Sequence, residues 1–581
     1  MNKDVHLTDN RNMLLAIVLS ALVLLGWSLL SDRFLPTALP PTTKVVDGKV
    51  EPLPQPSAGP TTPAPAAIRA RSVVLGESPR VSITTPSLAG SINLKGARFD
   101  DLVMVRQRET IAKDSPPVHL LSPAGTKGTY FAQFGWLGQG IAVPDANTLW
   151  TADSTSLAPS HPVTLTWTNP NGQRFEQTIA VDDGYLFTVK QRVANAGPAP
   201  ITVTPTGVVS RAAKSLDPST WTNHVGPIGF LDHKANYSVN WKTLDEDVAG
   251  STTNSRGGWL GFTDKYWLTA LAPADGAQIA GSFRKSPSGA YQADYAGAPI
   301  TIAPGKAVSG DTRLFAGAKE KQWLDKYEDA GITKLTKSID WGWFEWFMRP
   351  IFDLLQWLFH TTGNFGVAII CLTLIVRAIM FPIADKQFKS MAGMRRIQPK
   401  MKAIQDRHKD DKPRQQQEIM KLYQAEKINP AAGCLPILLQ IPVFYALYKT
   451  LMVSVEMRHQ PFALWIHDLS AADPLTPVNL FGLIPFTPPG MLAIGVLPII
   501  MGFTMWIQFK LNPAQMDPTQ QQIFSFMPWI LMFIMAPYAA GLLLYWCMSN
   551  ILTILQQKWL YKRYDLEKNS DAEGAVPAHH S

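Results

Sequence analysis

The sequence is poor in cysteine. Its 581 residues include three, Cys371, Cys434 and Cys547, and all three lie in or at the ends of apolar runs. The preceding stretch, residues 36–340, contains none, so it can lie in an oxidising compartment without depending on disulfide bonds. The cysteine spacing matches no metal-binding pattern. We expect neither a metal nor another cofactor.

Several catalytic signatures are also missing. The sequence contains no G-x-x-x-x-G-K-S/T phosphate loop, no H-E-x-x-H zinc motif and no G-x-S-x-G nucleophile motif. Its apolar segments carry no paired carboxylates. These absences argue against an ATPase, a metalloprotease and an esterase, and we predict that the chain is not an enzyme.

The charge is unevenly placed. The formal net charge is +8, and basic residues cluster at 386–427 and 558–563, beside apolar runs. This placement fits the positive-inside rule and an anionic cytoplasmic lipid surface. Residues 36–340 carry no long basic stripe, which disfavours binding to a specific nucleic acid. Most long apolar runs lie within residues 341–560, so we predict a water-soluble part joined to a membrane part.

The N-terminal region contains an apolar run and a linker. Residues 1–12 are polar, and the apolar residues 13–30 follow Lys3 and Arg11. The run exceeds the roughly 7–15 residues of a signal-peptide core, and no small-x-small cleavage site follows it. We predict a retained transmembrane anchor with a cytoplasmic N-terminus; a cleaved signal peptide is the alternative. Residues 31–69 are rich in Pro, Thr and Ala, a composition that cannot form a core, and they predict a Pro-rich linker that tethers the next domain.

Residues 70–340 predict an all-β domain. Val163 to Trp167 alternates in polarity, Asn169-Pro-Asn-Gly172 marks a turn, and Phe175 to Val181 alternates again. Alternation interrupted by Gly, Pro and Asn is typical of an antiparallel β-sandwich. Residues 318–330 predict a helix that closes the domain.

Residues 343–360 predict an amphipathic helix. Polar side chains recur along one side at intervals of three or four residues, and large apolar side chains fill the other. The polar side comprises Glu345, Arg349, Asp353, Gln356 and His360. Such a helix suits the membrane interface. An ordinary helix packed against its neighbours is the alternative.

Five further apolar segments approach the length of a bilayer span. They are residues 365–382, 434–455, 491–509, 523–537 and 539–556. Together with the anchor they give six transmembrane helices, which place both termini in the cytoplasm and the β domain in the periplasm. The segments between and after them are a cytoplasmic hairpin at 383–430, a periplasmic loop at 456–490, a cytoplasmic loop at 510–522 and a cytoplasmic tail at 557–581.

Loop charges agree with this topology. Residues 385–429 carry twelve Lys or Arg against six acidic residues, as expected of a cytoplasmic segment. Residues 456–490 carry Arg458 against three acidic residues, as expected of a periplasmic one. The basic segment also predicts a helical hairpin with one apolar seam. That seam comprises Phe388, Met391, Met394, Ile397, Met401, Ile404, Ile419, Leu422 and Tyr423. A solvated hairpin without a partner is the alternative.

Polar residues inside the spans are the candidate site. Arg377 lies roughly 7–8 Å from the cytoplasmic end of its span at Pro382, and Gln440 lies roughly 9 Å deep in the next span. Thr373 is one turn from Arg377, and Ser549 and Asn550 lie at a comparable depth in the last span. An arginine in hydrocarbon costs at least about 2.5–3.5 kcal/mol, so a polar site or snorkelling to the headgroups is needed.

Two causes could explain this clustering of polar groups in the cytoplasmic half. One is a hydrated cavity open to the cytoplasm; the other is a set of interhelical hydrogen bonds that hold the bundle together. A cavity with a fixed positive charge would let an acidic stretch of a nascent protein enter partway into the membrane. The apolar segment of that protein could then move sideways into lipid, driven by its own burial and without nucleotide.

Four segments in order carry a resemblance to a known family. They are LTLIVRAIMFPIADKQFKSMAGMRRIQPKMKAI, NPAAGCLPILLQIPVFYALYKTL, RHQPFALWIHDLS and GLLLYWCMSNILTILQQ. In these segments the chain resembles the YidC/Oxa/Alb family of membrane protein insertases, in the form that has a large periplasmic domain. The resemblance covers essentially the whole chain.

The resemblance implies a periplasmic β-supersandwich and a five-helix insertase core around a groove closed to the periplasm. The groove arginine matches Arg377, with Thr373 and Gln440 as its polar neighbours. An aromatic pair matches Tyr545 and Trp546, and Trp stands where a second Tyr is familiar. Asn550, from its depth alone, joins this groove set.

The resemblance also implies partners: nascent membrane proteins, ribosomes, the Sec translocon, membrane lipids and a link to the signal recognition particle pathway. The tail after Tyr564 is short and nearly balanced in charge, which disfavours ribosome binding through the tail. Two other functions are less favoured. A solute transporter would predict internal repeats, and none is evident. A sandwich that binds glycan or polypeptide on a membrane anchor would leave the polar residues of the spans unexplained.

Overall fold

The computed structural model describes most of the chain. The described residues are 43–46, 49–52, 68–217, 223–342, 344–409, 411–426, 435–481, 483–484, 486, 493–511 and 518–573. The predicted N-terminal segment 1–12, the predicted anchor 13–30 and Cys434 lie outside them. Part of the predicted loop 510–522 and the end of the predicted tail 557–581 also lie outside them.

The described residues divide into two compact units, one within residues 1–57 and the other within residues 58–581. Within the first unit, β1 (Thr43–Val46) pairs with β2 (Lys49–Pro52) in an antiparallel ribbon. This ribbon lies within the predicted Pro-rich linker at residues 31–69. Its strands contain three valines, and β-branched residues favour extended backbone. The sequence between the strands is Asp-Gly, a strong signal for a two-residue hairpin connection.

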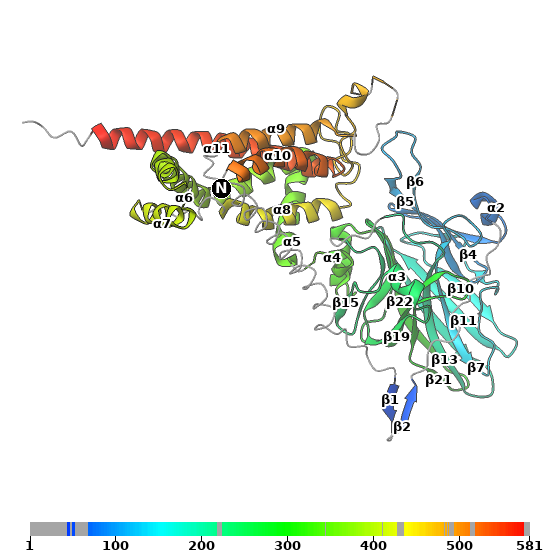
Figure 1. Ribbon diagram of the computed structural model, residues 1–581. Coiled ribbons are helices and arrows are strands. Elements are labelled where there is room, and N and C mark those ends of the chain that lie inside the picture. The colour runs from blue at the N-terminus through cyan, green and yellow to red at the C-terminus, as the bar shows by residue number, and fades with distance from the viewer. Residues whose placement is uncertain are drawn as a thin grey trace, which may run out of the picture. The chain divides into compact units, whose positions relative to one another are not determined.

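Two β-sheets make up the domain that follows (Figure 1). In spatial order, the nine-stranded sheet comprises β15 (Lys234–Asn236), β14 (Gly226–Leu231), β17 (Trp259–Thr263), β18 (Trp267–Pro273), β22 (Ala307–Ala318), β12 (Leu186–Asn195), β11 (Gln173–Val181), β10 (Val163–Thr168) and β8 (Thr151–Ala152). Its strands pair antiparallel, and β12 and β22 share the register Val189 to Thr312.

The second sheet has eleven strands. In spatial order, they are β16 (Ser251–Arg256), β19 (Gln278–Lys285), β20 (Tyr291–Gly297), β13 (Ile201–Arg211), β7 (Tyr130–Gln139), β5 (Arg98–Arg108), β4 (Leu88–Asn93), β3 (Arg80–Thr84) and β9 (Ser156–Leu157), with β21 (Ile300–Ile302) on β13 and β6 (Pro117–Leu121) on β5. The pairing of β3 with β9 is parallel. The two sheets confirm the predicted β-sandwich.

Aromatic side chains join the two sheets. Phe99 from the eleven-stranded sheet packs edge-on against Phe187 from the nine-stranded sheet, with ring centroids 5.3 Å apart. In β11 the alternation predicted for Phe175 to Val181 is confirmed, because every second residue is buried. One of these is Gln177, which donates a 3.1 Å hydrogen bond across to the carbonyl of Phe134. The polar residue on the buried face is therefore accommodated by the opposite sheet.

Three short helices and one 3₁₀ turn complete this domain. They are α2 (Arg71–Leu75), α3 (Trp241–Glu246), α4 (Lys321–Asp329) and η1 (Leu335–Ser338). The closing helix predicted at 318–330 is confirmed by α4, which begins three residues later. The Tyr327 hydroxyl of α4 donates to Asp182 (2.7 Å) and accepts from the Tyr185 amide (2.9 Å), which fixes the helix against the sheet.

The C-terminal region is helical. Its elements are α5 (Glu345–Thr362), α6 (Phe365–Arg407), α7 (Lys412–Ala425), α8 (Leu435–Val453), η3 (Pro477–Asn479), α9 (Val496–Leu511), α10 (Pro518–Met535) and α11 (Ala540–Glu573). Among the described residues, six of these helices share one apolar core, to which Leu355, Leu372, Leu447, Met501, Met535 and Leu543 contribute. The polar residues of the site described below lie around this core.

Helix α6 is longer than the predicted span 365–382. It continues to Arg407, with Pro382 and Pro399 inside it, and forms the first arm of the predicted hairpin. A proline removes one backbone hydrogen bond and disfavours a helix by about 3 kcal/mol, which the packing of the extension offsets. Phe388 packs on Tyr561 of α11, with ring centroids 5.9 Å apart. This residue of the predicted seam therefore contacts the last helix.

The predicted amphipathic helix 343–360 corresponds to α5, shifted by two residues. Its charged side pairs with the end of the β domain: Lys321 lies 3.0 Å from Asp353, and Arg349 lies 3.4 Å from Asp325. These pairs favour the alternative of a packed helix for this side. The exposed large side chains of α5 are Trp346 and Trp357.

One helical stretch among the described residues, Phe365–Lys386, is long and apolar enough to cross a membrane. Val496–Leu511 and Ser525–Met535 are shorter apolar helices. The predicted number of six spans therefore stays a prediction.

Candidate functional site

The site is built where α6 crosses α11. Arg377 of α6 donates from Nη2 to the carbonyl oxygen of Ser549, at 3.2 Å, and to the hydroxyl of the same residue. The Ser549 carbonyl also accepts from the Thr553 hydroxyl, at 2.7 Å, one turn further along α11. Arg377 is therefore held by a single residue of the neighbouring helix.

No carboxylate of the described chain pairs with Arg377, whose hydrogen bonds go to Ser549 alone. A guanidinium has five N–H donors, so most of the hydrogen-bonding capacity of Arg377 is available to another group. Its positive charge is uncompensated within the described part of the protein.

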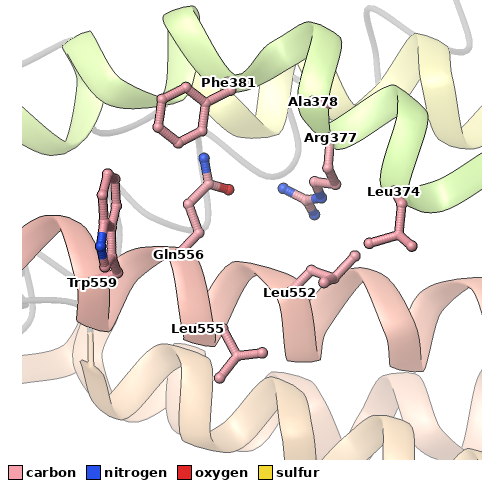
Figure 2. A pocket seen from close by; sticks show the side chains of 8 residues that line it. All are labelled: Leu374, Arg377, Ala378, Phe381, Leu552, Leu555, Gln556 and Trp559. Atoms are coloured by element: carbon pink, nitrogen blue, oxygen red, sulfur yellow. The ribbon is translucent and has the colours of Figure 1, made fainter.

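A pocket of about 350 Å³ adjoins this arginine. Figure 2 shows Arg377 and Gln556 extending into the space between α6 and α11, with Trp559 further along α11. The remaining lining is apolar and comprises Leu374, Ala378, Phe381, Leu552 and Leu555. The Nε2 atom of Gln556 is buried without a hydrogen-bond partner. The pocket thus combines one cation and one free amide donor with apolar walls.

A second polar contact lies beside the first on α11. Gln440 of α8 donates from Nε2 to the hydroxyl of Tyr545, at 2.9 Å. Tyr545 precedes Ser549 by four residues, so both lie on the same face of α11. That face therefore carries the contacts of both Arg377 and Gln440, which the sequence placed at similar depth. Trp546 lies beside this face and packs on Phe444 of α8, with ring centroids 4.7 Å apart.

Two of the predicted residues point elsewhere. Thr373 is buried, and its hydroxyl donates to the Ile369 carbonyl of its own helix at 2.7 Å. Asn550 is also buried and donates to the Thr504 hydroxyl of α9 at 3.1 Å. Neither lines the pocket, and the Asn550 contact joins two helices.

Sequence reasoning did not single out Thr504 or Gln556. Thr504 lies in the predicted span 491–509, and its signal was a hydroxyl within a largely apolar run that also contains Gln508. Gln556 is the last residue of the predicted span 539–556. A polar side chain is common at the end of a span, so Gln556 gave no signal of a site. Gln556 is of interest only because it lines the same pocket as Arg377.

No group of three or more His, Cys, Asp or Glu that could hold a metal ion occurs among the described residues.

Comparison with known proteins places this chain in a family. A family model described as the YidC periplasmic domain matches residues 80–354, and one described as the 60Kd inner membrane protein matches residues 357–568. Membrane protein insertase YidC of Zymomonas mobilis is 48% identical over 575 residues, covering 98% of each chain. The chain belongs to the YidC family of membrane protein insertases.

A second relative agrees with this assignment. The YidC insertase of Bradyrhizobium diazoefficiens is 44% identical over 600 residues, covering 96% of this chain and 97% of the relative. Among solved structures, one described as an active YidC insertase crystal structure with the first transmembrane domain resolved covers 86% of this chain and 94% of its own. It is 19% identical to this chain, with a TM-score of 0.36.

Family membership settles the broad function. The protein is a membrane protein insertase of the inner membrane, with a periplasmic domain, and it is not an enzyme. Nascent membrane proteins are accordingly its clients.

Proposed function

We propose that α6, α8 and α11 line a hydrophilic groove through which nascent inner-membrane proteins enter the bilayer from the cytoplasm. Arg377 supplies the fixed positive charge of the groove. Gln440 and Tyr545 supply polar groups at the same level, Thr373 lies one turn from the arginine, and Trp546 forms part of the aromatic wall. The protein acts as an insertase and as a folding chaperone.

The observation that carries this proposal is the uncompensated charge of Arg377 beside the pocket. A buried cation used only for structure is normally paired or fully hydrogen-bonded. Arg377 is bonded to Ser549 alone, and a pocket of about 350 Å³ adjoins it. An acidic side chain or a peptide carbonyl of a client could occupy the free N–H groups of this arginine.

The groove reduces the cost of moving a polar segment partway across the membrane. Desolvation of a charged group in hydrocarbon is prohibitive, whereas polar groups and a cation replace part of the lost water. The apolar segment of the client then moves into lipid, and its burial supplies about 25 cal/mol per Å² of apolar surface. Nucleotide hydrolysis is not part of this scheme.

The proposed topology has six spans, with both termini in the cytoplasm. It is supported by the loop charges: residues 385–429 carry twelve basic and six acidic residues. In this arrangement α7 and the extension of α6 form a cytoplasmic hairpin that recruits clients. The partners we propose are ribosomes carrying nascent chains, the Sec translocon and, upstream, the signal recognition particle pathway.

Insertion by the purified protein tests the proposal. The full chain is reconstituted alone in liposomes, a client with one or two spans and an acidic translocated end is added, and protease protection of that end is scored. We expect more protection than in empty liposomes, without nucleotide. Arg377→Ala should lower it, and Arg377→Lys should restore a large part, because lysine keeps the charge.

Lys510 provides the matched control. It is exposed at the end of α9, where it lies over the Trp506 ring at 4.0 Å, and it does not line the pocket. Lys510→Ala should leave insertion unchanged. Equal losses in Lys510→Ala and Arg377→Ala would mean that general surface charge matters and would contradict the groove. No insertion above empty liposomes would contradict autonomous activity on that client.

A further inference from the structure

The segment between α8 and α9 exposes an unusual number of large apolar side chains. They are Val478, Leu480, Phe481, Leu483, Ile484 and Phe486, and we refer to them as the apolar tip. Leu483 is 82% exposed and Phe481 is 54% exposed. Six such exposed apolar residues lie within nine positions of one loop. Soluble surfaces avoid gathering exposed apolar side chains in this way unless they bind something.

Backbone contacts hold the tip in this conformation. The Phe481 amide donates to the Thr476 carbonyl at 2.9 Å, and the Ile484 amide donates to the Asn479 carbonyl at 3.1 Å. Leu480 and Phe481 have φ of 49° and 58°, in the left-handed region that bulky residues rarely adopt. The tip therefore has a defined turn, built without burial of its own side chains.

The base of the loop is fixed to the helical bundle. Asp473 is buried and accepts from the Leu475 amide (3.0 Å), the Leu497 amide at the start of α9 (2.7 Å) and the Trp465 indole N–H (3.0 Å). The Val496 amide donates to the Leu475 carbonyl at 3.0 Å. The apolar tip consequently projects from the same end of the bundle at which α9 begins.

The sequence around the tip is uncharged. Asp473 is followed by no Asp, Glu, Lys or Arg until Lys510, at the far end of α9. The loop thus continues the uncharged character of a helix whose outward side chains, such as Phe503, are exposed apolar groups. A protein-binding surface normally carries a polar, charged rim around its apolar centre. An uncharged, protruding apolar surface beside a span fits lipid better.

We propose that the apolar tip inserts into the periplasmic leaflet of the membrane, with acyl chains and the glycerol region as its surroundings. Phe481 and Leu483 enter the bilayer, while Asp473 and the loop base stay at its surface. This gives the bundle a lipid anchor, separate from its spans, on the side opposite the proposed cytoplasmic entrance. The inference rests on the proposal that α9 crosses the bilayer.

Site-specific fluorescence in the full chain tests the insertion. The native cysteines are replaced, single cysteines are introduced by Leu483→Cys or Phe481→Cys, and each is labelled with an environment-sensitive NBD dye. The protein is reconstituted in phosphatidylethanolamine and phosphatidylglycerol vesicles, with and without lipids that carry a nitroxide on the acyl chain. Phe503→Cys reports whether α9 lies in lipid. Val248→Cys, an exposed apolar position in the β domain next to Asp247, is the matched aqueous control.

We expect blue-shifted emission and strong nitroxide quenching at positions 481, 483 and 503, and neither at Val248. Quenching at 503 without quenching at 481 and 483 would overturn the inference while leaving the span intact. A blue shift at 483 without lipid quenching would also overturn it, because a protein surface would then cover the tip. Absence of quenching at all three positions would contradict the proposed span of α9 as well. Circular dichroism of each labelled variant checks that its fold is retained.

Discussion

Polar residues inside the bundle can either line a hydrated cavity or form hydrogen bonds that hold helices together. The contact between Asn550 and Thr504 allows these two explanations to be tested. Asn550 donates to the Thr504 hydroxyl at 3.1 Å, and the two residues are 5% and 9% exposed. Both are thus shielded from the pocket and from solvent. We predict that this pair stabilises the bundle and does not contact clients.

The structure predicts unequal effects of the two single substitutions. Thr504→Val leaves the Asn550 amide buried without a partner, which should cost about 1–3 kcal/mol. Asn550→Leu should cost less, because the Thr504 hydroxyl keeps its bonds to the carbonyls of Ile500 (2.8 Å) and Met501 (3.0 Å). Interhelical hydrogen bonds in membrane proteins contribute about 0.6–1.7 kcal/mol in double-mutant cycles, and we expect a coupling energy in that range.

The assay combines unfolding with insertion. The free energy of unfolding of the wild type, the two single variants and the double variant is measured in mixed micelles. Client insertion in liposomes is then normalised to the amount of folded protein. We expect a stability loss with unchanged specific insertion. A loss of insertion by Asn550→Leu at unchanged stability would refute the reasoning and return Asn550 to the groove.

Three further predictions follow from other parts of the chain. Burial raises the pKa of Asp294 from 3.8 to about 6 despite its arginine partner, so its contribution to stability is full below pH 3.8 and is lost as pH rises through 6. Asp294→Asn should therefore flatten the pH dependence of the melting temperature in that window; an unchanged slope would contradict this. Gly317→Ala places a methyl group against the buried Tyr185 ring and should cost about 1–3 kcal/mol in chemical denaturation, whereas Gly310→Ala on the same strand meets nothing within 4 Å and should be neutral. Replacing residues 385–427 by a Gly/Ser linker should impair insertion of most clients, and normal insertion would contradict a recruiting hairpin.

Much of the fold follows from local sequence patterns. Alternating polarity in β11 and the helical period of α5 identify these elements to within about two residues, because each pattern reflects one buried face. The end of α6 could not be found in the same way. Pro382 suggested that the helix ends there, but α6 continues to Arg407. Beyond the proline, Phe388 is buried against α11, and this contact joins residues far apart in sequence.

The charged side of α5 illustrates a different limit. Spacing along one helix predicted a polar stripe, and the stripe exists, but spacing carries no information about what faces it. Judged from spacing alone, membrane headgroups and the side chains of α4 are equally suitable partners for these charges. In the structure Asp353 and Arg349 pair with residues of α4, so two of the stripe's charges support contact between the helical region and the β domain.

The depth of a residue in the membrane can be estimated by counting residues along its helix, but its hydrogen-bond partners cannot be found in this way. Arg377, Gln440 and Asn550 look alike in the sequence, because each is a polar residue about two turns from the predicted cytoplasmic end of its span. Their contacts around α11 distinguish them. Ser549 and Tyr545, on one face of α11, bind Arg377 and Gln440, whereas Asn550 points to a different side and binds α9. A residue able to bind a client keeps unused hydrogen-bond donors or acceptors after the helices have packed. A residue that holds helices together has used them. By this criterion we expect Arg377, with its free donors beside the pocket, to bind clients, and we expect Asn550 to stabilise the contact between α11 and α9.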